Sequence, residues 1–177
     1  MARRDAEEFT AFVAASSPSL RRTAYLMCGD WELASDHVQE GLIRVYRAWP
    51  RLHRDGRLLA YARRAVVSAA IDASRKRSST EVPVDRIVDR SSGRDDAAVV
   101  AERDALQRCL SRLGGRQRAC VVLRHYDDMP VAEVAEILGC SEGTVRSQTA
   151  RALTTLAALW AEETGDEALA VNGGRES

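Results

Sequence analysis

The sequence of 177 residues predicts an all-α protein, built from two small helical domains joined by a flexible linker. Apolar residues recur at spacings of three and four over long stretches, which is the period of an amphipathic helix. Aromatic residues make up only 5% of the chain, and glycine and proline stand mostly alone between these stretches. Residues 78–97 instead combine Pro, Ser and Gly with no helical period, which indicates a linker.

The first domain is predicted over residues 5–77, beginning with two helices. Phe9 and Phe12 mark a short amphipathic helix. Ser17 and Pro18 then match the N-cap and first position of a second helix, which Gly29 ends.

A third and a fourth helix complete the first domain. Asp30 is a good N-cap for the third helix, and Pro50 is expected to end it. A polar loop over residues 51–56 leads to the fourth helix, over residues 57–75. The third helix has an apolar stripe formed by Trp31, Ala34, Val38, Leu42, Val45 and Trp49.

The second domain is predicted over residues 98–161, followed by an acidic tail over residues 162–177. A first helix ends at Gly114 and Gly115, and a turn at residues 127–130 follows the second. Leu106, Leu110 and Leu113 line the inner face of the first helix, and Ala119, Val122, Leu123 and Tyr126 that of the second.

Residues 131–153 have the pattern of a helix-turn-helix. Gly139 suits a tight turn with positive φ, and Ser141 is a favoured N-cap for the second helix. Arg and Gln can bond guanine and adenine edges in the major groove, and Ser or Thr can reach bases or phosphates. The predicted inner face contains Val145, Thr149, Leu153, Leu156 and Trp160. The predicted DNA-binding face contains Thr144, Arg146, Ser147, Gln148 and Arg151.

The fourth helix of the first domain carries a basic outward face. Residues 57–77 contain six positive side chains and one acid, although the chain as a whole has no net charge. A row of positive side chains that includes an aromatic ring is suited to bind partly single-stranded DNA, because guanidinium groups hold phosphates and rings stack on bases. With the preceding loop, the candidate residues are His53, Arg54, Arg57, Tyr61, Arg64, Ser68 and Arg75.

The outward face of the third helix is mixed in charge, which suits contact with another protein better than contact with DNA. It contains Asp36, Gln39, Glu40, Arg44 and Arg47.

No catalytic, metal or membrane site is predicted. The four cysteines and three histidines have no metal-ligand spacing, and no apolar run reaches the ~20 residues that span a bilayer. We therefore expect a cytoplasmic protein with reduced thiols and no cofactor.

The motifs together resemble regions 2 and 4 of extracytoplasmic-function sigma factors of the sigma-70 family. The resemblance to region 2 rests on residues 36–48, 61–64 and 70–77, and that to region 4 on residues 116–126 and 134–148. Ser147-Gln148 and Glu81-Val82-Pro83 look most like the actinobacterial SigE-like subgroup.

The resemblance implies a transcription initiation factor rather than an enzyme. The helix over residues 36–49 would dock on the β′ clamp helices of RNA polymerase core, and the β flap is a second implied contact. The basic helix with its loop would capture a flipped base and open the −10 element, and the recognition helix would read double-stranded DNA at −35. An anti-sigma factor is a further implied partner.

Three other classes fit the residues less well. An autonomous helix-turn-helix regulator would need a dimerisation helix or an effector pocket, and it has no use for the basic aromatic-bearing helix. An anti-sigma or adaptor protein would leave the recognition helix idle. An enzyme would need a nucleophile–base pair, a phosphate loop or a ligand cluster, none of which the sequence contains.

Overall fold

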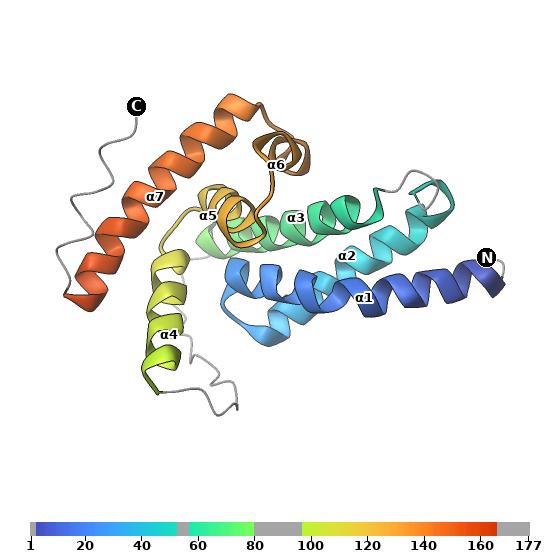
Figure 1. Cartoon of the computed structure of the whole chain (residues 1–177), viewed down its shortest axis with the longest axis horizontal. Coiled ribbons are helices and arrows are strands. Elements are labelled where there is room, and N and C mark those ends of the chain that lie inside the picture. The colour runs from blue at the N-terminus through green and yellow to red at the C-terminus, as the bar shows by residue number, and fades with distance from the viewer. Residues whose placement is uncertain (1–2, 53–56, 80–96, 166–177) are drawn as a thin grey trace.

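Helices account for nearly all of the residues that the structure, a computed structural model, describes (Figure 1); these are residues 3–52, 57–79 and 97–165. No strand occurs in these ranges, so the all-α prediction is confirmed. His53, Arg54 and nearly all of the predicted linker lie outside the described residues. The helices are α1 Arg3–Cys28, α2 Trp31–Leu52, α3 Leu58–Ser79, α4 Ala97–Ser111, α5 Gly115–Val121, the π-helix η1 Val122–Tyr126, α6 Val131–Leu138 and α7 Glu142–Thr164.

The first two predicted helices form one continuous helix, α1, so the predicted break at Pro18 is wrong. The Ser17 hydroxyl donates to the Val13 carbonyl at 2.6 Å instead of capping a new helix. The apolar stripe of α1 also continues across the proline, since Phe12 and Leu20 pack in the same core with α2 and α3. Tertiary packing on both sides of Pro18 therefore outweighs its local preference for a helix start.

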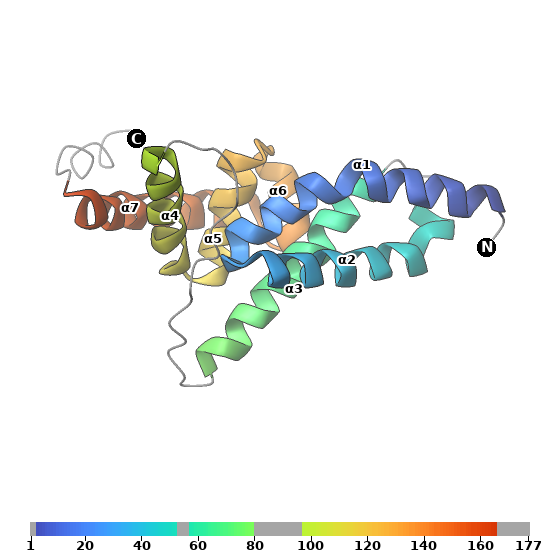
Figure 2. The same ribbon diagram turned by 90° about the horizontal axis from the view of Figure 1, so that it is seen from below.

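Helices α2 and α3 pack against one another in the N-terminal block, by which we mean α1, α2 and α3, and α3 crosses α2 obliquely in Figure 2. The Asp30 carboxylate accepts from the backbone N–H groups of Glu32 and Leu33, as predicted for an N-cap. Pro50 does not end α2, which runs two residues further to Leu52. The two helices approach closely at Gly41, where an added Cβ would lie 2.6 Å from Val66 Cγ2.

The C-terminal block, by which we mean α4, α5, η1, α6 and α7, contains a π turn that the sequence did not indicate. The Asp127 N–H donates to the Val122 carbonyl at 3.0 Å, five residues earlier. This wider turn shifts the following residues out of α-helical register. Tyr126, which was predicted to face inward, is therefore 50% exposed, whereas Val122 and Leu123 are buried as predicted.

The two blocks share one hydrophobic core. Helix α3 packs against α5 and α6, and α1 packs against α4 and η1 (Figures 1 and 2). Met27, Val67 and Ala70 of the N-terminal block are buried together with Leu123 and Val134 of the C-terminal block. A fully buried side chain of this size contributes roughly 1.5–3 kcal/mol relative to an exposed one, so the contact between the blocks is substantial.

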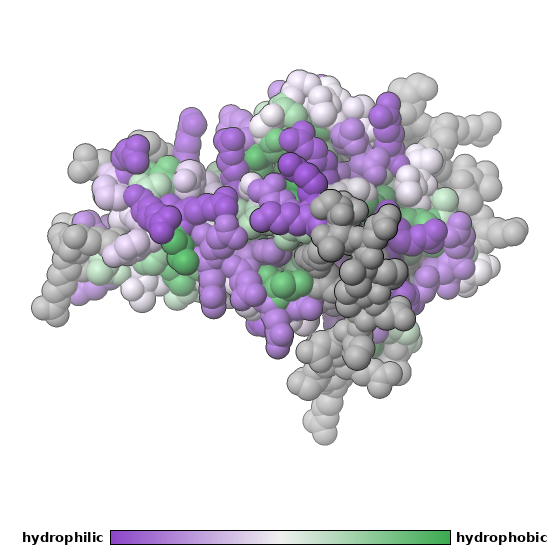
Figure 3. Space-filling view, turned by 180° about the vertical axis from the view of Figure 1, so that it is seen from behind, coloured by the Kyte–Doolittle hydropathy of each residue, from purple (hydrophilic) through white to green (hydrophobic). Residues whose placement is uncertain are grey.

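The surface viewed from behind is mostly hydrophilic, with small separated hydrophobic patches (Figure 3). Scattered patches of this kind are normal for a folded chain. No helix of the described part is both long and apolar enough to cross a membrane.

Candidate nucleic-acid interface

The turn of the helix-turn-helix has the geometry that the sequence predicts. Gly139 has φ of +61°, in the left-handed region that favours glycine, and the Cys140 N–H closes α6 on the Ala135 carbonyl. The Ser141 hydroxyl accepts from the Thr144 N–H at 3.1 Å and caps α7. Gly139 and Ser141 thus set the angle at which α7 leaves the turn.

The predicted DNA-binding face lies on the first turns of α7. Arg146, Ser147 and Arg151 are exposed, whereas Thr144 and Gln148 are half-buried. The Arg146 guanidinium is 2.7 Å from the Glu142 carboxylate, an exposed pair that contributes little and can exchange for a phosphate or base. The structure therefore brings all five predicted residues together at the same end of one helix.

The inner face of α7 is rotated from the prediction. Val145, Ala152 and Leu159 are its buried residues, at a spacing of seven. Leu153 was predicted to face inward but is 40% exposed, because the small Ala152 lies against α4 and α5 instead. A wheel of uniform 100° steps could not indicate that an alanine is fully buried while the neighbouring leucine is exposed.

The predicted basic face of α3 is not uniformly open. Arg57, Arg64 and Arg75 are exposed, and Arg75 lies 3.3 Å from Asp72. Tyr61 and Ser68 are half-buried. The C-terminal block packs beside the middle of this face: an added Cβ on Gly139 would lie 3.8 Å from Arg64 Nη2.

Most of the residues on the predicted outward face of α2 are exposed to solvent. Arg44 is half-buried and pairs with Glu40 one turn earlier. Asp36, Gln39 and Arg47 are exposed beside them, so the mixed-charge set forms one continuous face.

Two charged residues with buried side chains, Arg118 and Asp127, join the blocks in a way that the sequence did not indicate. Arg118 donates to the Met27 carbonyl of α1 and to the Ser111 and Leu113 carbonyls at the end of α4. The Asp127 carboxylate accepts from the Thr23 hydroxyl of α1 at 2.9 Å and lies 3.9 Å from Arg63 Nε of α3. A charged residue in a predicted helix or turn gives no sequence signal of this role, since Met27 and Thr23, the partners in the other block, are distant along the chain.

Burial of Asp127, whose side chain is 6% exposed, raises the pKa of its carboxyl above the ordinary value. The Thr23 hydroxyl and the guanidinium groups of Arg63 and Arg22 oppose this rise without cancelling it. Because the folded pKa is raised, Asp127 contributes stability at low pH that is lost as pH rises through the folded pKa.

We therefore expect Asp127→Asn to gain stability relative to the parent as pH increases from 3 to 7, as measured by urea denaturation. A constant difference across this range would contradict the prediction.

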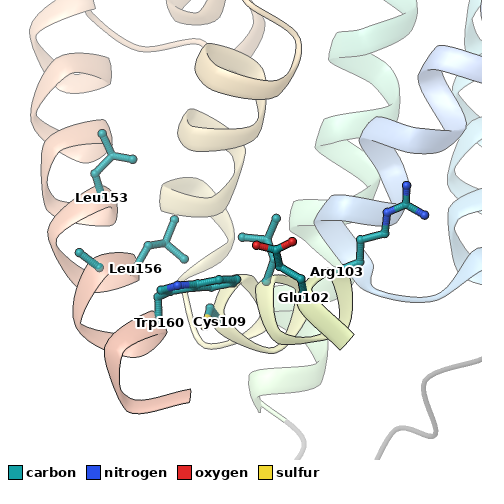
Figure 4. A pocket seen from close by; sticks show the side chains of 8 residues that line it. Glu102, Arg103, Cys109, Leu153, Leu156 and Trp160 are labelled. Atoms are coloured by element: carbon teal, nitrogen blue, oxygen red, sulfur yellow. The ribbon is translucent and has the colours of Figure 1, made fainter. Parts of the chain in front are cut away.

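A cavity of about 530 Å³ lies between α4 and α7 (Figure 4). Cys109, Leu156 and Trp160 form its apolar wall. Leu106, predicted to face inward, is instead 42% exposed at this cavity. Arg108 of α4 pairs with Glu163, and Arg112, directly after α4, pairs with Glu162. These two glutamates of the predicted tail belong to α7.

The thiols and acids of the described residues show no arrangement typical of a metal site. No group of three or more His, Cys, Asp or Glu side chains gathers there. Burial raises the pKa of the Cys120 thiol to about 11, so it stays protonated and unreactive at neutral pH.

Family models of known proteins match both blocks of the chain. The model of sigma-70 region 2 matches residues 12–80, and that of sigma-70 region 4 matches residues 103–156. The RNA polymerase sigma-E factor of Streptomyces avermitilis is 36% identical over 157 residues, covering 88% of this chain and 87% of that protein. SigM of Mycobacterium tuberculosis, an ECF RNA polymerase sigma factor, is 34% identical over 79% of this chain and 70% of its own.

A solved structure has the same fold. The sigma factor RpoE of Bartonella quintana, crystallised with the anti-sigma factor NepR, aligns with a TM-score of 0.70 over 86% of this chain and 96% of its own, at 21% identity. The comparisons support the sigma-factor hypothesis and not the autonomous regulator. This chain is thus a member of the extracytoplasmic-function group of the sigma-70 family, an RNA polymerase sigma factor.

Proposed function

We propose that this sigma factor divides promoter recognition between α7 and α3. The exposed start of α7 reads the double-stranded −35 element in the major groove. The basic face of α3, with His53 and Arg54 before it, binds the −10 element as it becomes single-stranded. The observation that carries the proposal is the capped, exposed start of α7, where the predicted −35 residues lie on one helix end.

Two surfaces suit the contacts with RNA polymerase core. The mixed-charge face of α2 faces solvent and can dock on the β′ clamp helices. The apolar cavity between α4 and α7 has room for hydrophobic side chains of the β flap. We place the protein in the cytoplasm, where the polymerase acts, and assign it no enzymatic activity of its own. Because the RpoE relative was crystallised with NepR, an anti-sigma factor is also proposed as a partner.

Run-off transcription tests this function directly. Bacterial core polymerase is incubated with a promoter library, with and without the protein. Promoter-specific transcripts that require the protein are expected, and their start sites reveal the −35 and −10 sequences. Absence of transcripts, together with sequence-specific binding of the protein alone to duplex DNA, would contradict the division proposed here.

Substitutions on α7 should weaken −35 binding. Gln148→Ala or Arg151→Ala is expected to cost about 1–3 kcal/mol of binding and to relax discrimination at the contacted base pairs. Fluorescence anisotropy with −35 duplexes measures both effects. Arg112→Ala is a charge-matched control, because its partner Glu162 lies roughly 20 Å along α7 from Gln148. Equal binding by all three variants would show that the DNA-binding face is elsewhere.

Substitutions on α3 should affect promoter opening more than initial docking. We expect the double variant Arg64→Ala, Arg75→Ala to reduce permanganate reactivity of −10 thymines by roughly tenfold to thirtyfold, because the two lost cations together cost on the order of 2 kcal/mol of strand binding. Binding of the holoenzyme to closed promoter DNA should change less. The Arg112→Ala control should open the promoter normally. Full thymine reactivity in the double variant would show that this face of α3 does not bind the −10 element.

A further inference from the structure

A second cavity, of about 650 Å³, lies between the N-terminal and C-terminal blocks, and we call it the inter-block cavity. It adjoins the cavity between α4 and α7 and shares Leu106 and Leu156 with it. Cavities of about 300–1,000 Å³ bind small organic molecules, so this one is large enough for such a ligand. Its lining includes Tyr25 and Leu26 of α1, Trp31 of α2, Gln107 of α4, Tyr126 of η1 and Leu156 of α7.

One wall of the inter-block cavity is flat and aromatic. The rings of Tyr25 and Trp31 are stacked, with their centroids 4.0 Å apart and an interplanar angle of 11°. The Arg21 guanidinium carbon lies over the Trp31 ring, 5.0 Å from its centroid, and this contact helps to hold the ring in place. Aromatic rings pack well against other rings, either stacked or edge to face. The wall therefore favours a planar aromatic ligand over a flexible aliphatic one.

A buried polar atom, the side-chain oxygen of Gln107, lies at this cavity. The Gln107 residue is 5% exposed, and its Oε1 accepts no hydrogen bond from the described part of the chain. Its Nε2 is turned toward the end of α1, where the Tyr25 carbonyl lies 3.5 Å away and an added Cβ on Gly29 would lie at 2.8 Å. A buried acceptor without a donor is unfavourable, and an N–H group of a ligand would satisfy it.

The charges around the cavity indicate a neutral ligand. Arg22 and Arg103 are exposed and Asp104 is half-buried, so the charged lining residues are of both signs. The buried lining is apolar at Leu110 and Val122. An ion held against these side chains would lose its hydration without gaining a charged partner there. The buried part of the cavity therefore disfavours both cations and anions.

We propose that the inter-block cavity binds a small, neutral, planar aromatic molecule that carries an N–H donor. The ring system packs beside Tyr25 and Trp31, and the N–H group donates to Gln107 Oε1. None of the described residues assigned to the −35 or −10 element lines the cavity, so this binding is separate from promoter recognition and can be tested without polymerase or DNA. Because the ligand contacts both blocks, its binding stabilises the folded chain by mass action.

Indole and benzofuran are a matched pair of probes for this site, because their shapes are nearly the same and only indole has an N–H donor. Each probe is titrated into the isotope-labelled full chain, and NMR follows the side-chain N–H signals of the three tryptophans. Trp31 reports the inter-block cavity, and Trp160 reports the cavity between α4 and α7. Trp49 is buried in the core of the N-terminal block and is the internal control.

We expect indole to shift the Trp31 signal saturably, with a dissociation constant of roughly 0.1–1 mM for so small a probe. Benzofuran should bind about fivefold more weakly, because it leaves the Gln107 oxygen without a donor. The variant Gln107→Leu should bind both probes equally. Gln117→Leu, the same exchange on α5 outside the cavity, should keep the fivefold difference.

Three results would overturn the proposal. The first is the absence of a saturable Trp31 shift, and the second is a larger shift at Trp160 than at Trp31. The third is equal binding of the two probes by the parent chain, or a difference between them that persists in Gln107→Leu. The comparison of the two probes on the parent chain needs no variant, so the test remains decisive even if Gln107→Leu does not fold.

Discussion

Replacing Arg118 with alanine is expected to lower the free energy of unfolding by about 3–5 kcal/mol. The substitution removes the donor to three backbone carbonyls, those of Met27, Ser111 and Leu113, and these oxygens lie where water has little access. A buried acceptor without a donor costs about 1–3 kcal/mol. Because the carbonyls belong to both blocks, the loss affects the whole molecule rather than one helix.

Urea denaturation followed by far-UV circular dichroism measures this loss. Arg116→Ala is the matched control, because Arg116 is exposed on the same helix and its removal should change stability by no more than about 0.5 kcal/mol. An Arg118→Ala protein as stable as Arg116→Ala would mean that the three carbonyls find other donors.

Gly41→Ala is expected to destabilise the N-terminal block by about 1–3 kcal/mol, although alanine favours a helix over glycine by about 1 kcal/mol. The added methyl group would lie 2.6 Å from Val66 Cγ2 and 3.2 Å from the Val66 backbone nitrogen, so overpacking exceeds the helix preference. The sequence alone offered no reason for a glycine inside α2. The close approach of α3 supplies it.

A double-mutant cycle isolates the Gly41 contact. Val66→Ala removes the Cγ2 atom that the new methyl group would meet. The double variant should therefore be more stable than the sum of the two single losses predicts, with a coupling of about 0.5–3 kcal/mol. Thermal unfolding of the four proteins gives this coupling. Strict additivity would show that the cost of Gly41→Ala comes from another contact.

Local chemistry explains which features of the fold the sequence could predict. Asp30 and Ser141 cap helices because their side chains reach backbone N–H groups two or three residues away. Gly139 adopts the positive φ that the tight turn after α6 requires. The position of the predicted −35 residues at the start of α7 follows from the same local register. These features depend on a few consecutive residues, which a single sequence displays.

The features that the sequence could not predict depend on distant partners. The continuity of α1 through Pro18 depends on packing against α2 and α3, and the rotation of α7 depends on Ala152 against α4 and α5. The bond of Arg118 to Met27 and that of Asp127 to Thr23 join residues that are 91 and 104 positions apart. The predicted basic face of α3 includes the exposed Arg64 and Arg75, but the burial of its middle beside the C-terminal block depends on the tertiary structure.

The shared core also has a consequence for synthesis on the ribosome. Met27, Val67 and Ala70 are made early, but their partners extend to Val145. After α3 is complete, residues 80–145 still have to be translated, which takes roughly 3 to 13 s at about 5–20 residues per second. During that interval the nascent N-terminal block exposes an apolar surface that only the later half of the chain can cover. The newborn protein is then at its most vulnerable to aggregation and proteolysis.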